Sequence, residues 1–124
     1  MDKVNLAKKL SLFNDYFNPR IVGELSQRGS LPWQVKLVKF KGEFVWHHHE
    51  AEDELFYVVK GSFDMQLRGE TITVNAGEFV IVPKGVEHCP RAEDEVEIML
   101  FEPASVLNTG NVNNELTVEA PRKI

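Results

Sequence analysis

The chain has one cysteine, no long apolar run and no excess of basic residues. The single cysteine, Cys89, cannot form an intrachain disulfide, so the fold has to rest on a hydrophobic core. A chain of 124 residues buries roughly 65% of the surface that its unfolded form exposes, which is enough for such a core. We therefore expect one domain over residues 1–124. Because an unpaired cysteine is typical of a reducing compartment, we also expect a cytoplasmic location.

The charge balance and the short apolar runs argue against two classes of partner. Fourteen Lys and Arg residues stand against nineteen Asp and Glu residues, a net charge of −5, which provides no general attraction to phosphate backbones or anionic lipids. The apolar runs, such as Phe79 to Val82, fall far short of the ~20 residues of a membrane helix. We expect no nucleic-acid partner and no membrane partner.

Short strand-like segments separated by glycine turns dominate the chain. Before them, apolar residues at helical spacing from Val4 to Phe13 predict one short amphipathic helix in the N-terminal segment 1–19. The strand-like segments are residues 21–22, 35–40, 43–49, 55–59, 62–67, 70–74, 79–82 and 96–101. No long helix separates them as a parallel crossover would. The pattern therefore predicts an all-β fold, an antiparallel sandwich or barrel.

Two polar segments lie outside the predicted strands. Residues 24–32 are rich in turn formers and predict a surface loop, whose role the sequence does not indicate. Residues 103–124 are polar and rich in Asn, and we expect a partly ordered C-terminal tail with one short strand at 116–118.

Three of the four histidines stand together at residues 47–49. In a strand, successive side chains alternate between faces, so His47 and His49 would point one way and His48 the other. Neutral imidazoles suit Zn, Fe and Ni, and an added carboxylate extends the choice to Mn. Any of the acidic residues at 50 and 52–54 could supply that carboxylate, and the turn before His88 could return this histidine to the same place. A solvated His-rich and acidic patch fits the same residues, so spacing alone leaves both interpretations open.

Two stretches resemble the two sequence motifs of the cupin family. Residues 42–61 contain a glycine, then His47-x-His49, four residues, Glu54, six residues and Gly61. Residues 77–88 contain Gly77, five residues, Pro83-x-Gly85, two residues and His88. The match departs from the motifs at two positions: four residues rather than five separate Gly42 from His47, and Ala92 stands where an Asn often closes the second motif.

The resemblance implies a cupin double-stranded β-helix, which is a jelly-roll barrel, with its core in residues 33–102. It implies one divalent metal ion (Zn, Mn, Fe or Ni) held by His47, His49, Glu54 and His88. Cys89, next to His88, is expected to be a small buried apolar residue and not a ligand. The chain looks most similar to small cupins described as mannose-6-phosphate-isomerase-like.

Two functions are compatible with this resemblance. The first is a metal-dependent enzyme of isomerase, lyase or dioxygenase type on a small organic substrate, and the second is a non-catalytic module that binds or senses a small molecule. Strand parity places Phe56 on the face of Glu54 and makes Met65, Met99 and Phe101 candidate neighbours in a small apolar pocket, although each could equally be a core residue. Few basic residues accompany the motifs, which favours a neutral or weakly charged substrate over a sugar phosphate.

The predicted barrel also suggests an oligomeric state. A small barrel leaves strand edges with unpaired backbone groups, and pairing around a two-fold axis would cover them. We expect a homodimer.

Overall fold

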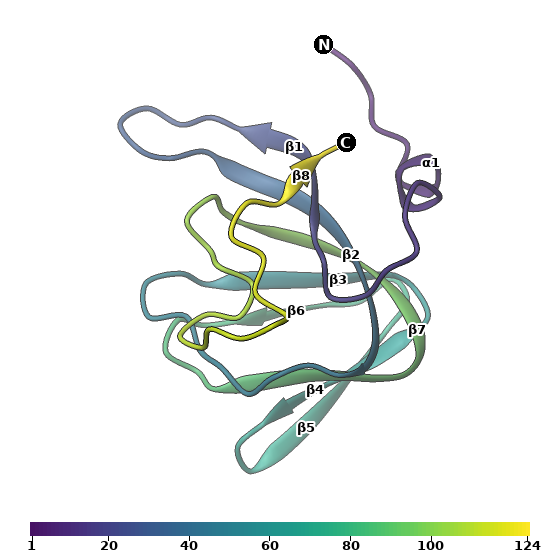
Figure 1. Ribbon diagram of the computed structural model, residues 1–124, viewed down its shortest axis with the longest axis vertical. Helices are drawn as coiled ribbons and strands as arrows, with labels where there is room; N and C mark the ends of the chain where they lie inside the picture. The colour runs from purple at the N-terminus through teal and green to yellow at the C-terminus, as the bar shows by residue number, and fades with distance from the viewer.

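The computed structural model describes all residues, 1–124, and consists mainly of β-strands (Figure 1). Its elements are α1 (Leu6–Leu10), β1 (Arg20–Leu25), β2 (Trp33–Glu43), β3 (Glu54–Lys60), β4 (Ser62–Leu67), β5 (Glu70–Asn75), β6 (Phe79–Val82), β7 (His88–Pro103) and β8 (Arg122–Lys123). The expectation of an all-β fold with one short N-terminal helix is confirmed. No helix of the chain is both long enough and apolar enough to cross a bilayer.

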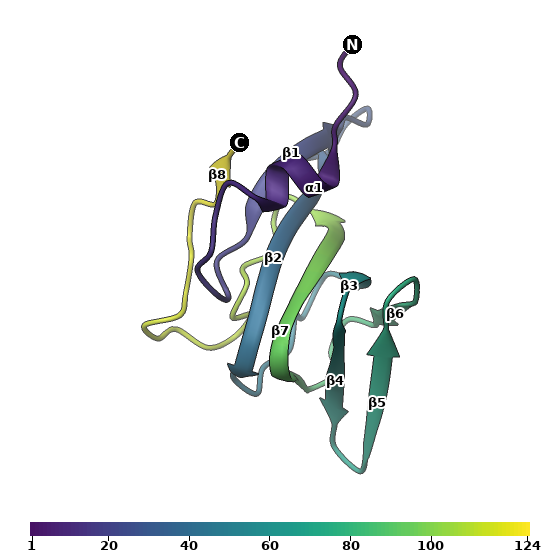
Figure 2. The ribbon, with the colours of Figure 1, turned by 90° about the vertical axis from the view of Figure 1, so that its right-hand side faces the viewer.

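The helix is shorter than its apolar pattern predicts. It begins after Asn5, whose side chain accepts a hydrogen bond from the Lys8 N–H at 3.0 Å, and it ends before Ser11. Leu10 and Phe13 pack against Leu37, so α1 covers part of the outer face of β2 (Figure 2). The tertiary contact, and not helix length, holds this segment in place.

The long strand β7 joins the two halves of the barrel. Its first residues, from His88 to Arg91, pair with β4, and the stretch from Glu97 to Phe101 pairs with β3. β2 runs antiparallel beside β7 along most of its length, with a register shift between Phe40 and Gly42. Such an irregularity bends a strand, and β2 and β7 curve together around one side of the barrel (Figure 1).

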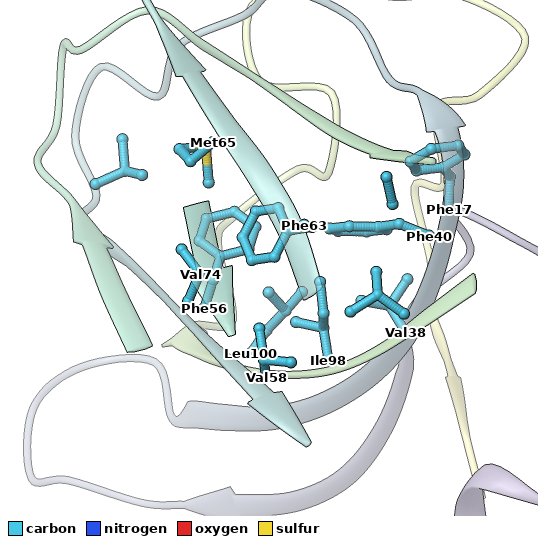
Figure 3. Packing of buried hydrophobic residues seen from close by; sticks show 13 residues of the cluster. Phe17, Val38, Phe40, Phe56, Val58, Phe63, Met65, Val74, Ile98 and Leu100 are labelled. Carbon is cyan, nitrogen blue, oxygen red and sulfur yellow. The ribbon is translucent and has the colours of Figure 1, made fainter. Parts of the chain in front are cut away.

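The barrel interior is filled by alternate residues of the strands. Along β3, for example, Phe56 and Val58 are buried while Tyr57 between them is only half-buried. Figure 3 shows that the side chains of several strands point toward one another in this core. The buried cluster consists of Phe17, Val38, Phe40, Phe56, Val58, Phe63, Met65, Val74, Val82, Ala92, Val96, Ile98 and Leu100.

Three predicted strands differ from the structure. Residues 44–49 form no regular strand, and their pairing is limited to an isolated bridge between His47 and His88. The strand predicted at 96–101 is the end of the 16-residue β7, whose exposed acidic residues 93–95 interrupt the apolar alternation. No strand forms at 116–118. Instead, the two-residue strand β8 pairs parallel with β1.

The two polar segments, residues 24–32 and 103–124, differ in how well the structure matches what their sequences predict. Residues 24–31 are exposed, as expected for a surface loop, but residues 24 and 25 still belong to β1 and residues 26–32 alone connect β1 to β2. The segment that follows β7 is irregular but packed, since Val106 and Thr109 are buried. The Asn108 side chain also bonds the backbone of Leu116 and Val118. The strand predicted at 116–118 is thus replaced by side-chain hydrogen bonds.

Candidate metal centre

Backbone pairing between His47 and His88 brings the two halves of the site together. The N–H of each residue donates to the carbonyl of the other, at 3.0 and 2.9 Å. Residues opposed in an antiparallel pair have Cβ atoms about 5 Å apart. The bridge therefore places the two imidazole rings side by side, with centroids 4.2 Å apart.

A second contact determines which nitrogen each ring presents. Nδ1 of His47 lies 2.8 Å from the carbonyl oxygen of Val45, and Nδ1 of His88 lies 2.9 Å from that of Val86. A carbonyl oxygen only accepts, so Nδ1 carries the proton in both rings and Nε2 carries the lone pair. Metal-binding histidines are typically oriented in this way. Both Nε2 atoms are thus available as ligands.

His49 and Glu54 complete a four-residue cluster with these two histidines. Nε2 of His49 lies 3.2 Å from Oε1 of Glu54, and Nε2 of His88 lies 3.7 Å from the same oxygen. One ligand atom from each of the four residues falls within 4.8 Å of the others, and all four side chains are buried. The structure therefore brings together the four residues that the sequence predicted as ligands.

Three atoms of this cluster are buried without a hydrogen-bond partner. They are Nε2 of His49, Nε2 of His88 and Oε1 of Glu54. Buried polar atoms are nearly always partnered, and an unpartnered group requires an explanation. Three imidazoles and one carboxylate form a donor set that suits a first-row divalent cation. The residues present thus fit a metal ion.

His48 lies outside the cluster, although it stands between two of its members. Its side chain is 25% exposed, and Nε2 lies 3.6 Å from Oε1 of Glu50. The alternation predicted from a strand therefore holds here, even though the segment pairs at His47 alone. Cys89 is fully buried, is not a member of the cluster, and burial raises the pKa of its thiol to about 11.

The protonation states suit cation binding. Burial, followed by the neighbouring His88, lowers the pKa of His47 from 6.5 to about 4. Burial by itself would raise the pKa of Glu54, but the neighbouring side chains of Glu102, His49 and His88 hold it well below its usual value. A neutral imidazole and an ionised carboxylate are the forms that bind a metal.

Sequence reasoning missed a second buried carboxyl group beside Glu54. Glu102 is 1% exposed and lies next to Glu54, because Leu55 of β3 pairs with Phe101 of β7. Its Oε1 lies 3.2 Å from Nζ of Lys36, which is also buried. Burial, and then the charge of Glu54, raise the pKa of Glu102 well above its usual value. Strand parity contained a signal, because Glu102 follows the inward-facing Ile98 and Leu100 at the same spacing of two.

A narrow cavity of about 20 Å³ adjoins the cluster, which is room for about one water molecule. His47 and Glu54 form its polar side, and Phe17 stacks on both Phe40 and Phe44 at its wall. Phe17 has a φ of 57°, a left-handed conformation that is uncommon for a bulky residue. The lining residues are Phe17, Pro19, Val38, Phe40, Phe44, His47, Glu54, Phe56, Pro90, Leu100 and Asn108.

The predicted pocket residues are only in part at this cavity. Phe56 lines it, whereas Met65 is fully buried in the core and does not reach it. Met99 and Phe101 lie on the other face of β7, where Met99 packs near α1 and Phe101 stacks on Trp33. Ile98 and Leu100 face inward instead, so the assumed parity of β7 was wrong by one residue.

Comparison with known proteins agrees with this fold. A family model described as a cupin domain (Cupin_2) matches residues 36–102. The crystal structure of a cupin-2 domain containing protein from Shewanella frigidimarina is 45% identical, with a TM-score of 0.76. The match covers 81% of this chain and 93% of that one.

Two curated proteins of Bacillus subtilis match shorter parts of the chain. An uncharacterised protein, YdbB, is 39% identical over 59 residues, which are 47% of this chain and 52% of that protein. A quercetin 2,3-dioxygenase is 35% identical over 71 residues, which are 51% of this chain and 21% of that enzyme. The matched region is thus about half of the first relative and about a fifth of the second.

Proposed function

The chain belongs to the cupin family, in its Cupin_2 branch, and we propose that it binds one divalent metal ion through His47, His49, Glu54 and His88. The chain would then act on a small organic molecule as a metal-dependent enzyme of isomerase, lyase or dioxygenase type. The second candidate, a module that binds or senses a small molecule without reaction, uses the same residues.

One observation carries this proposal. The buried Nε2 atoms of His49 and His88 and Oε1 of Glu54 have no partner in the protein, and a shared cation would satisfy all three. Without it, each group would bear the desolvation cost of an unmade hydrogen bond, about 1–3 kcal/mol. The residues involved come from the stretch after β2, from β3 and from β7, so the fold and not local sequence brings them together.

The chain's own residues would prepare the site for this chemistry. The Val45 and Val86 carbonyls hold the rings of His47 and His88 with Nε2 toward the cluster. The aromatic wall excludes water, which strengthens electrostatic interactions inside. A bound divalent ion would supply a Lewis acid that polarises an oxygen of the ligand. Zn, Mn, Fe and Ni are the candidates that the donor set accepts.

The cavity lining favours a small neutral or weakly charged ligand. No Lys or Arg lines it, whereas a phosphate group would call for one. Neither basic residue near the second motif, Lys84 or Arg91, lines the cavity, and the side chain of Arg91 lies 3.7 Å from Asp64. A mannose-6-phosphate-isomerase-like activity and a cytoplasmic location stay predictions. The dioxygenase relative adds oxygen chemistry to the reactions worth testing.

The proposal predicts that metal removal and ligand substitution destabilise the protein together. Binding only to the folded state stabilises by about 4 kcal/mol when free metal exceeds Kd a thousandfold, which corresponds to an order of 10 °C in Tm for a domain of this size. A chelator should therefore lower Tm of the metal-loaded protein by that amount. His47→Ala, His49→Ala, His88→Ala and Glu54→Gln should each reduce both the metal content and the effect of the chelator.

His48→Ala is the matched control, because His48 lies between two proposed ligands but points away from them. It should keep the metal content, measured by elemental analysis, and the chelator shift. Equal losses for His48→Ala and its two neighbours would contradict the assigned site. The metal found in protein purified without added metal would then separate the reactions, because iron favours oxygen chemistry and zinc or nickel favours isomerase, lyase or binding roles.

A further inference from the structure

Three buried ionisable side chains lie next to one another beside the proposed metal site. Lys36 of β2 contacts Glu102 of β7 at 3.2 Å. Leu55 of β3 pairs with Phe101 of β7, so Glu54 and Glu102 lie at the next position of the two strands, opposite one another. The exposed fractions of Lys36, Glu102 and Glu54 are 2%, 1% and 3%. Their strands are neighbours in the barrel, with β7 between β2 and β3. Glu102 therefore lies between the ammonium group and the proposed ligand.

The ammonium of Lys36 depends on this arrangement. The Glu102 carboxyl group is the one acidic group in contact with Nζ of Lys36. A buried charge without a partner is costly. A lysine has four side-chain methylene groups, so its ammonium can move to a new partner when the old one is removed. The carboxylate beyond Glu102 is that of Glu54.

We propose that Glu102 is a positioning residue that separates Lys36 from Glu54 and so leaves the Glu54 carboxylate available to a divalent cation. Without Glu102, the ammonium would pair with Glu54 and compete with the cation for its oxygens. The Lys36–Glu102 pair is thus the outer support of the metal site. This inference rests on the proposed function, since it concerns a ligand of that site.

The test is a double-mutant cycle read by titration of the metal-free protein with Zn²⁺. Glu102→Met removes the separating carboxyl group and should weaken Zn²⁺ binding 10- to 100-fold, the range known for residues that orient metal ligands. Lys36→Met removes the competing ammonium and should bind Zn²⁺ at least as tightly as the wild type. The double variant Lys36→Met/Glu102→Met, which lacks both charges, should return close to the wild-type affinity.

The rescue separates this role from a merely structural one. If the double variant binds as weakly as Glu102→Met, Glu102 does not act by holding Lys36 away, and the inference is overturned. Wild-type affinity in Glu102→Met would overturn it as well. A wild-type protein that fails to bind Zn²⁺ would instead contradict the proposed function.

Folding is checked by circular dichroism, because Glu102→Met leaves a buried ammonium without its partner. If that variant does not fold, Lys36→Met is compared with the double variant, since both lack the ammonium and replacement of a buried ion pair by apolar residues is tolerated. Equal Zn²⁺ affinity in these two proteins supports the proposal. A loss of tenfold or more in the double variant shows that Glu102 orients Glu54 directly, which overturns it.

Discussion

His47 lies where burial and a second imidazole both disfavour its charged form. Its side chain is 2% exposed, and its ring stands 4.2 Å from that of His88. These surroundings lower its pKa from 6.5 to about 4. A folded protein that keeps a histidine neutral loses stability where the unfolded chain can take up the proton and the folded one cannot.

We expect the metal-free protein to be most stable, as far as His47 is concerned, above pH 6.5. Stability should fall as the pH drops from about 6.5 to about 4, by about 3 kcal/mol in total, because each pKa unit corresponds to about 1.4 kcal/mol. Urea unfolding at several pH values measures the slope. His47→Gln should flatten the slope and His48→Gln should keep it. An unchanged slope in His47→Gln would show that His47 is not held neutral.

Single residues of the site differ in how far sequence alone could predict them. Motif spacing and side-chain alternation predicted that His47 and His49 lie together and that His48 points away. Phe17 gave no comparable signal, because its role depends on contacts with strands far along the chain, whereas the inward position of Glu102 followed from the alternation of β7 once its parity was known. Phe17 reaches the cavity through a left-handed backbone conformation. That conformation can be anticipated from sequence at glycine or asparagine, but not at phenylalanine.

The segment after β7 is clamped onto the residues that carry the histidines. The Asn111 N–H donates to the carbonyl of His48 at 3.1 Å, and the His48 N–H donates to the Asn111 side chain at 2.9 Å. Gly110 fits against the same place with a φ of 55°, and a Cβ atom there would collide with the carbonyl oxygen of His48. The irregular segment 44–49 thus gains from the tail the support that strand pairing does not provide.

Gly110→Ala should therefore damage both stability and metal binding. The collision with backbone atoms adds to the cost of a positive φ, so we expect a loss of about 2–4 kcal/mol in thermal unfolding and weaker Zn²⁺ binding. Gly69→Ala is the control, since Gly69 has a φ of 92° but free space around its Cα. It should lose about 1 kcal/mol and keep its Zn²⁺ affinity. Equal effects of the two substitutions would show that the clamp does not support the site.

At the level of elements, strands with regular alternation of apolar and polar residues could be predicted from the sequence, and strands with interrupted alternation could not. β4 and β6 begin and end where the pattern and its glycine turns indicate. The sequence pattern predicted only residues 96–101 of β7. Its first half was not predicted, because exposed acidic residues at 93–95 interrupt the alternation of inward and outward residues. The missing strand at 44–49 has the same origin, since the motif spacing is kept while ladder pairing is reduced to one bridge.

The whole molecule has an apolar outer sheet face in addition to its core. Across β6, β3, β7 and β2, two rows of paired residues contain no charge. Within them, Phe79 is 60% and Ile81 is 51% exposed, and β6 has no neighbour on its other edge. The rows are Phe79, Tyr57, Met99 and Leu37, and Ile81, Leu55, Phe101 and Val35.

We expect a homodimer that buries the exposed part of this face, at Phe79 and Ile81, around a two-fold axis. Helix α1 already covers Leu37, and contiguous exposed apolar patches on monomers are small. Light scattering at micromolar concentration should report twice the mass of 14.2 kDa. Phe79→Lys should shift the protein toward monomer. Thr71→Lys adds the same charge to exposed β5, away from the apolar rows, and should leave the mass unchanged. A wild-type monomer, or equal behaviour of both variants, would contradict the expectation.

The central position of β7 in the sheet has a consequence for folding during synthesis on the ribosome. β7 carries His88 at its start and Glu102 near its end, and it pairs with β2, β3 and β4. All three partners precede it in the chain, so before β7 is synthesised they can pair with β1, β6 and β5 but are not joined to one another. Such long-range pairing is slow and leaves strand edges open in the meantime. The proposed ligand set also lacks His88 until β7 is synthesised, so metal binding would coincide with the closure of the barrel by β7.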